Sequence, residues 1–327
     1  MMIIPPETEM LRLMTSDQVC FIAPKSMPAQ LLVIALTFCF FSSGLAEEKP
    51  KTPHPGQSHF IANNTVEYVP GTLPVIIAAP HGGRLTPVAI PDRTEGVVVT
   101  DANTDLLARE IAEALHQLTR QHAHLVICHL KRSKVDCNRD ALTGTGGNAA
   151  AMETWQAFHD CIESARTTGR ELYLDIHGHS HPQARVELGY QLSAEQLTWS
   201  GASLAALENR STISSLAKTS PDVFEERLRG KSSLGGLLES EGFPSIPSPT
   251  HPDPAGQPYF SGGFNAERYG PGVDGSQFIS VQIECPREGV RDSDRNRKRF
   301  AEVLAESIVV FLKRHADVDL LTQQSRP

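Results

Sequence analysis

Two histidines stand directly after apolar segments of this 327-residue chain. The run 73–79 leads into Pro80-His81-Gly82-Gly83, and the run 171–176 leads into His177. A short apolar run bounded by turn residues is typical of a strand buried on both faces. Ligands of open α/β sheets bind beyond the carboxyl ends of the strands. We therefore expect both imidazoles to face one cleft, although a tight turn or a histidine-rich surface turn would also accommodate them.

Two carboxylates accompany these histidines. Asp175 lies two residues before His177, so both side chains point to the same face of a strand. A carboxylate there suits the far ring nitrogen of a metal-bound histidine. Glu284 ends the apolar run 278–284, where an acidic side chain is costly without a partner or a role. Pairing with Arg287 or Arg291 is the alternative for Glu284.

A third cluster follows the apolar run 123–130. Arg132, Asn138 and Arg139 lie within eight residues of one another in the sequence. A guanidinium group matches a carboxylate in bidentate fashion, and it is also suited to stabilise an oxyanion. The cluster favours binding of an anionic substrate, with a solvated charged loop as the alternative.

Taken together, these motifs resemble the N-formylglutamate amidohydrolase family, which is related to the zinc carboxypeptidases. Six blocks occur in the order of that family, namely residues 80–83, 103–105, 132–139, 175–177, 262–270 and 281–284. The resemblance implies that His81 and His177 are zinc ligands and that Glu284 is the general base. It also implies that Arg132 polarises the scissile carbonyl. The substrate-binding residues would be Asn138, Arg139, Arg268 and Tyr269, with Asp175 supporting a ligand.

The third metal ligand departs from the carboxypeptidase pattern. That pattern has a Glu three residues after the first His, and this chain has Arg84 there. The family block suggests Asp105 instead, with Asp101 and Glu95 as alternatives. Asp105 also suits the first turn of a helix, where a carboxylate interacts favourably with the helix dipole.

The elements that position these residues alternate between strands and helices. Strands are expected at residues 73–79, 123–130, 171–176 and 278–284, and helices at 105–121, 149–166 and 295–315. This alternation predicts an α/β fold whose mixed, mostly parallel sheet carries helices on both faces. The resemblance implies the zinc-carboxypeptidase-like (phosphorylase/hydrolase-like) version of that fold.

The chain divides into four expected segments. Residues 1–46 resemble a signal peptide, because an apolar run at 29–41 is followed by small residues at 43–46. Export with cleavage after Ala46 is expected, to the periplasm or outside the cell, with a membrane anchor as the alternative. Residues 47–70 are expected to form a flexible lead-in and residues 71–320 one metallohydrolase domain. Within it, residues 200–258 are expected to form an irregular insertion or lid.

Composition limits the partners. The net charge is −8 and aromatic residues make up 6% of the chain, which argues against nucleic-acid binding. Stable membrane insertion after cleavage is also not expected. The expected partner is a small molecule or peptide with a free carboxylate. Four cysteines follow Ala46 and allow two disulfides in three connectivities.

The expected activity is zinc-dependent hydrolysis of an amide bond in an N-acyl amino acid or peptide, as for N-formyl-glutamate. Export argues against a role in cytoplasmic histidine breakdown. The alternatives are a carboxypeptidase or cell-wall peptide hydrolase of the same fold, and a non-catalytic carboxylate-binding protein. A serine esterase is disfavoured, because residues 230–235 lack the Gly-x-Ser-x-Gly spacing of a nucleophile elbow.

Overall fold

The computed structural model describes residues 54–166, 169–218, 223–272 and 277–322. By its contacts the chain divides at residues 50/51, and all described residues belong to the second unit, residues 51–327. The signal-peptide and cleavage predictions therefore lie outside the described residues. Within the described ranges, no helix has the length and apolar character needed to cross a membrane.

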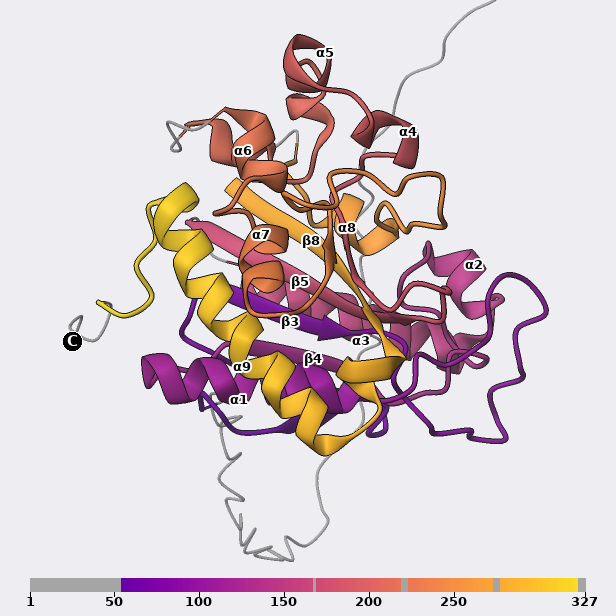
Figure 1. Cartoon of the computed structure of the whole chain (residues 1–327). Helices are drawn as coiled ribbons and strands as arrows, with labels where there is room; N and C mark the ends of the chain where they lie inside the picture. The colour runs from indigo at the N-terminus through magenta and orange to yellow at the C-terminus, as the bar shows by residue number, and fades with distance from the viewer. Residues whose placement is uncertain (1–53, 167–168, 219–222, 273–276, 323–327) are drawn as a thin grey trace, which may run out of the picture. The chain divides into compact units, whose positions relative to one another are not determined.

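An eight-stranded mixed sheet forms the centre of the second unit (Figure 1). Its spatial order is β1-β2-β4-β3-β5-β8-β6-β7. The central strands β4, β3, β5 and β8 are parallel, as are β6 and β7, whereas the pairs β1–β2, β2–β4 and β8–β6 are antiparallel. The strand bounds are β1 His59–Ile61, β2 Val66–Val69, β3 Val75–Ala79, β4 His124–Cys128, β5 Arg170–His179, β6 Val186–Gly189, β7 Ser245–Ile246 and β8 Gln277–Pro286.

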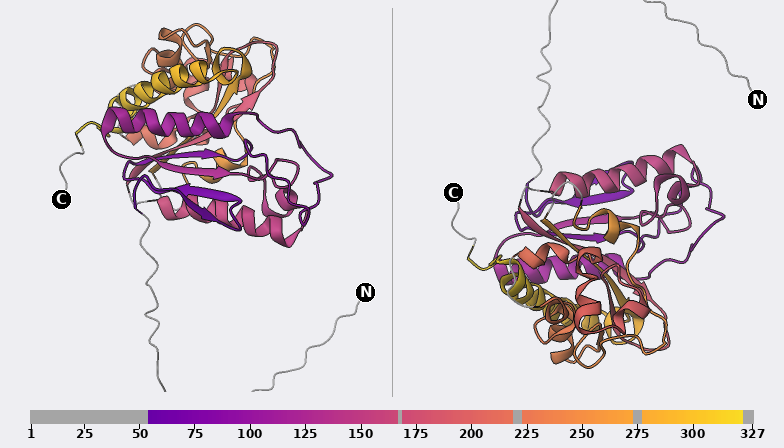
Figure 2. Two further views of the ribbon diagram at one scale, coloured as in Figure 1. Left: turned by 90° about the horizontal axis from the view of Figure 1, so that it is seen from below. Right: turned by 90° about the horizontal axis from the view of Figure 1, so that it is seen from above.

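Helices cover both faces of this sheet. Helices α1 (Thr104–Thr119) and α9 (Asp294–Phe311) pack side by side on one face, and α3 (Ala149–Ala165) covers the other, as Figure 2 shows. The predicted α/β fold with a mixed, mostly parallel sheet and helices on both faces is confirmed.

Side-chain alternation along the strands builds a separate core under each layer of helices. In β5, Leu174 and Ile176 join the core that includes residues of α1 and α9, whereas Tyr173 joins the core beneath α3. Strand β8 follows the same pattern, with Val281 and Phe278 on opposite faces. Because successive side chains of a strand point to opposite faces, this alternation decides which polar residues lie together.

Shorter elements complete the unit. They are α2 Ala141–Thr145, α4 Ala194–Leu197, α5 Gly201–Ala205, η1 Glu208–Arg210, η2 Ser214–Lys218, α6 Phe224–Arg229, α7 Leu234–Ser240, α8 Phe264–Arg268, η3 Arg287–Arg291 and η4 Leu312–Ala316.

One segment prediction needs correction. Residues 47–70 were expected to be a flexible lead-in, but β1 and β2 extend the sheet there, because Val66 and Tyr68 are buried against the core beneath α3. The described part of residues 200–258, predicted as an irregular insertion or lid, contains several short helices. It also supplies β7, and Leu204 and Leu238 are fully buried in the main core.

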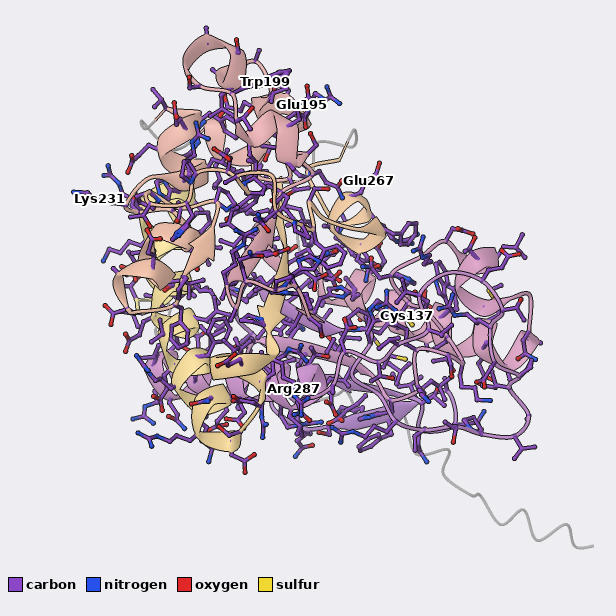
Figure 3. All side chains as sticks on the ribbon, turned by 45° about the vertical axis from the view of Figure 1, so that its right-hand side comes forward. Cys137, Glu195, Trp199, Lys231, Glu267 and Arg287 are labelled. Atoms are coloured by element: carbon purple, nitrogen blue, oxygen red, sulfur yellow. The ribbon has the colours of Figure 1, made fainter. Side chains whose placement is uncertain are left out.

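The four cysteines of this unit, among them Cys137 (Figure 3), are buried free thiols. Cys285 belongs to the core beneath α1 and α9, whereas Cys128, Cys137 and Cys161 belong to the core on the opposite face. This division argues against two disulfides among these four cysteines.

Candidate metal centre and substrate cavity

The carboxyl ends of the parallel strands bring the predicted site residues together. His81 follows β3, the segment 131–140 follows β4, and His177 and Glu284 lie in β5 and β8. The parallel register sets His177 opposite Glu284 and Asp175 opposite Gln282. Because the paired residues point to the same face, four polar side chains of two neighbouring strands share one surface.

Three buried side chains form a group that can bind a metal ion: His81, Asp101 and His177. The Nδ1 atoms of the two histidines are 3.1 Å apart. The Oδ2 atom of Asp101 lies 3.5 Å from His81 Nδ1 and 3.2 Å from His177 Nδ1. Three potential ligand atoms from three separate segments therefore converge on one point.

Asp105 was the preferred third ligand, and the structure places Asp101 there instead. The backbone N–H of Asp101 donates to the carbonyl of His81 at 3.1 Å, which fixes this turn against the end of β3. Asp105 lies four residues later, in the first turn of α1, and its Oδ1 is 3.8 Å from Nη2 of Arg84. Among the described residues, neither Asp105 nor Glu95 belongs to the group around the histidines.

Each histidine of the group has a second carboxylate on its outer nitrogen. His81 Nε2 lies 2.6 Å from Asp136 Oδ1, and His177 Nε2 lies 2.8 Å from Asp175 Oδ2. Such partners hold the proton on Nε2 and leave a lone pair on Nδ1. The geometry predicted for Asp175 is present, and Asp136 provides the same for His81.

The arrangement fits a bound cation. Two Nδ1 lone pairs and a carboxylate oxygen meet within 3.5 Å in a buried region, which is unfavourable without positive charge between them. The pKa of His177 reflects the same demand for positive charge. Burial lowers this pKa, but the carboxylates of Asp175 and Asp101 outweigh burial and raise it well above its ordinary value. A divalent metal ion would meet this demand in place of protons.

Glu284 lies beside this group and lines the adjoining cavity. Burial raises its pKa to about 7, with His177 opposing and Asp101 and Glu187 reinforcing the rise. Its Oε1 accepts a hydrogen bond from Gln282 Nε2 at 3.0 Å. A carboxyl group with this pKa is suited to both accept and return a proton near neutral pH.

A cavity of about 420 Å³ opens at the candidate metal centre. Its walls include Arg132, Asn138 and Arg139, as the sequence predicted, together with His177, Asp101 and Glu284. Arg132 is held by two carboxylates, with Nη1 3.2 Å from Asp101 Oδ1 and Nε 3.3 Å from Asp136 Oδ2.

Asn138 and Arg139 differ in how they are held. The Oδ1 atom of Asn138 accepts the backbone N–H of Asn265 at 2.7 Å, which docks the start of α8 on the cavity. Arg139 is 44% exposed, and its closest carboxylate is Asp136, at 3.9 Å from Nε. Arg139 is therefore the guanidinium group that is most available to a ligand among the described cavity residues.

Arg268 and Tyr269 were predicted to bind substrate, but neither lines this cavity. Tyr269 is buried beneath the sheet, and its hydroxyl lies 2.6 Å from His159 Nδ1. Arg268 lies over the ring of Trp155, with Cζ 5.7 Å from the ring centroid. The short helix α8 turns both side chains away from the strand ends toward α3, so this prediction is corrected.

Among the described residues, His179, His181 and Glu187 form a second group with metal-ligand spacing. Both ring nitrogens of His179 are used by the backbone. Nδ1 accepts the N–H of His181 at 3.1 Å, and Nε2 donates to the carbonyl of Arg185 at 2.8 Å. The group therefore braces the connection between β5 and β6.

Several residues of the site were not predicted from the sequence. Asp136 and Gln282 lie within the blocks 132–139 and 281–284 that resemble the family. Each lies two residues before a predicted site residue, Asn138 or Glu284, and this spacing could have indicated them. Val97, Phe260 and Phe264 also line the cavity. No local pattern distinguishes these three from ordinary loop residues, because only the fold brings their segments to the strand ends.

Comparison with known proteins gives a likeness of fold. No family model and no curated protein matches the chain. An N-formylglutamate amidohydrolase from Ralstonia eutropha is 13% identical, with a TM-score of 0.46 over 78% of this chain and 99% of that one. A metallo-carboxypeptidase from Pseudomonas aeruginosa is 13% identical, with a TM-score of 0.41 over 80% of this chain and 64% of that one. An N-acetylmuramyl-L-alanine amidase from Mycobacterium smegmatis is 14% identical, with a TM-score of 0.36 over 73% of this chain and 96% of that one. The case for function rests on the side chains described above.

Proposed function

We propose that this protein is a zinc-dependent hydrolase that cleaves the amide bond of an N-acyl amino acid or peptide with a free carboxylate. One observation carries the proposal: the group of His81, Asp101 and His177 adjoins a cavity that also contains Glu284 and Arg139. Two of the three potential metal ligands, a group for proton transfer and a carboxylate-binding cation thus line one space.

The donor set favours zinc among divalent ions. Two imidazole nitrogens and one carboxylate oxygen, with a fourth position left open, are typical of catalytic zinc sites. Tetrahedral zinc with ligands at about 2.0–2.2 Å needs ligand atoms roughly 3.3–3.6 Å apart. The separations of 3.1, 3.2 and 3.5 Å are close to this spacing. When bound, zinc would polarise a carbonyl and lower the pKa of water.

The chain's own residues would then perform three tasks. Glu284 would take a proton from the attacking water and return it to the leaving nitrogen. Arg139 would bind the substrate carboxylate, with Asn138 beside it. Arg132, fixed between Asp101 and Asp136, would donate to the developing oxyanion.

Metal content tests the first part of the proposal. The purified protein should contain about one zinc ion per chain, because the three ligand atoms define a single site. His81→Ala and His177→Ala should each lose it, as measured by elemental analysis after dialysis. Failure of the wild-type protein to bind supplied zinc would refute a zinc hydrolase.

Replacement of Glu284 tests the second part. Glu284→Gln should retain zinc but lower kcat for N-acyl amino acid hydrolysis by about 10²–10⁴-fold, because the proton acceptor is removed. Glu267→Gln is the matched control, since Glu267 is an exposed residue on α8 (Figure 3). Full activity in Glu284→Gln would reject this assignment.

We also propose that the protein is exported and then processed. The support is the apolar run at 29–41 followed by small residues at 43–46. Mass spectrometry of the protein recovered from its source should find a mature chain that starts at Glu47. A membrane-anchored protein would instead retain the apolar run.

A further inference from the structure

Part of the wall of the cavity is apolar. Val97 lies in the loop after β3, Phe260 lies in the loop after β7, and Phe264 begins α8. Val97 is 48% exposed and Phe260 is 44% exposed, so both offer apolar surface to a ligand. Burial of such surface against an apolar ligand group favours binding.

Phe260 is held in place from two sides. Its ring stacks on that of His181, with centroids 4.7 Å apart and an interplanar angle of 19°. Its backbone N–H donates to Oε2 of Glu187 at 2.9 Å, while Oε1 of Glu187 lies 2.8 Å from His181 Nδ1. The connection braced by His179 thus supports a preformed wall, which lowers the ordering cost of binding.

The charges of the cavity limit how many carboxylates a substrate can carry. Among the described cavity residues, the cations are Arg132 and Arg139. Arg132 already contacts two carboxylates, whereas the terminal nitrogens of Arg139 have no partner among the described residues. One substrate carboxylate can therefore be matched by an available guanidinium group.

A second substrate carboxylate would meet negative charge. Asp140 lies in the same cavity next to Arg139. Hydrogen bonds from the side chain and backbone N–H of Thr143 hold the pKa of Asp140 below its ordinary value, so this carboxylate is ionised at neutral pH. Without a second available cation, a dicarboxylate such as N-formyl-glutamate lacks a complementary site.

We propose that the preferred substrate carries a single carboxylate and an apolar group that contacts Phe260 and Val97, and that dicarboxylates are poor substrates. This inference rests on the proposed function. It names the substrate class of the same site, and the apolar group belongs either to the amino acid side chain or to the acyl chain.

A substrate panel tests the inference on the zinc-loaded protein. N-formyl-L-leucine should have a kcat/KM about 10- to 100-fold above that of N-formyl-L-glutamate, the range that pocket contacts of this size provide. N-formyl-L-glutamine is the uncharged control for side-chain size. N-octanoylglycine, compared with N-formylglycine, tests whether the apolar group belongs to the acyl chain. Higher kcat/KM for N-formyl-L-glutamate than for all apolar substrates would overturn the inference and leave the proposed function intact.

Two variants locate the preference. Phe260→Ala should lower kcat/KM for the preferred apolar substrate about tenfold relative to kcat/KM for N-formylglycine. Val97→Arg adds a cation at an exposed position, and it should raise activity on N-formyl-L-glutamate relative to N-formyl-L-leucine about tenfold. Unchanged ratios in both variants would contradict the assigned wall.

Binding separates the two proposals if no substrate is hydrolysed. Calorimetry of the wild-type protein with the same panel should give a Kd about tenfold lower for the apolar monocarboxylates than for N-formyl-L-glutamate. That outcome without turnover would reject the hydrolase and retain the inference on ligand class. Equal or weaker binding of the apolar compounds would reject the inference.

Discussion

At the residue scale, the candidate metal centre depends on carboxylates that contact the ring nitrogens of two histidines. Asp136 and Asp175 hold the outer nitrogens of His81 and His177, and Asp101 meets both inner nitrogens. Asp136 also contacts Arg93 and Arg132, so one buried carboxylate orients a histidine and two guanidinium groups. Loss of such outer partners typically lowers metal affinity by about 10–100-fold.

The choice between two aspartates gives a direct test at this scale. Asp101→Asn should weaken zinc affinity by about 100-fold or more, because it removes the charged oxygen that faces both Nδ1 atoms. Asp105→Asn, four residues away, should bind zinc like the wild-type protein. Competitive titration with a zinc chelator measures both affinities. The opposite ranking would restore Asp105 as the ligand.

At the element scale, close contacts between backbones set where the strand ends lie. A Cβ atom on Gly83 would come 2.3 Å from the carbonyl carbon of His129, so the segment after β3 touches the segment after β4. This contact fixes the spacing between His81 and the arginine cluster.

Gly83→Ala should therefore destabilise the fold by more than about 2 kcal/mol, because backbone must move to admit the methyl group. Gly256→Ala is the matched control. Gly256 has φ of +76° with nothing within 4 Å of the added Cβ, so only the backbone conformation opposes the change, at about 1 kcal/mol. Urea unfolding of both variants provides the comparison, and equal losses would argue against the contact.

At the scale of the second unit, each face of the sheet has its own core, and the core beneath α3 contains buried histidine. Burial lowers the pKa of His159 to about 3, and the nearby Arg268 reinforces the effect. Its Nδ1 is engaged by the hydroxyl of Tyr269. His124, at the start of β4, also has its pKa lowered by burial, to about 4.

These histidines make stability depend on pH. In the folded state His159 stays neutral until about pH 3, whereas in the unfolded state it takes up a proton below its ordinary pKa of 6.5. The contribution of His159 to the free energy of unfolding is therefore complete above pH 6.5. It is lost as pH falls toward 3, by at most about 1.4 kcal/mol per pH unit.

His159→Gln should accordingly lose less stability than the wild-type protein between pH 7 and pH 4.5, by about 2 kcal/mol. His54→Gln, at an exposed position, serves as the control. Urea unfolding at both pH values measures the difference. An identical pH dependence in His159→Gln and the wild-type protein would contradict a neutral buried histidine.

The sequence by itself determined the fold class and most of the candidate site. Apolar runs ending in His81, His177 and Glu284 were readable because a buried strand needs a continuous apolar stretch. Parallel strands then align their carboxyl ends at one edge of the sheet. That local rule placed His177, Glu284, Arg132, Asn138 and Arg139 around one cavity, with His81 buried behind its wall next to His177.

Only the tertiary structure decided between residues that local patterns cannot separate. Asp101 and Asp105 are only four residues apart, and the backbone contact of Asp101 with His81, next to the end of β3, selects Asp101. Tyr269 is directed to His159 by the packing of α8 against the sheet. The edge strands β1 and β2, and the wall formed by Val97 and Phe260, depend equally on partners far away in sequence. Such choices are made by distances between segments, which a linear pattern does not contain.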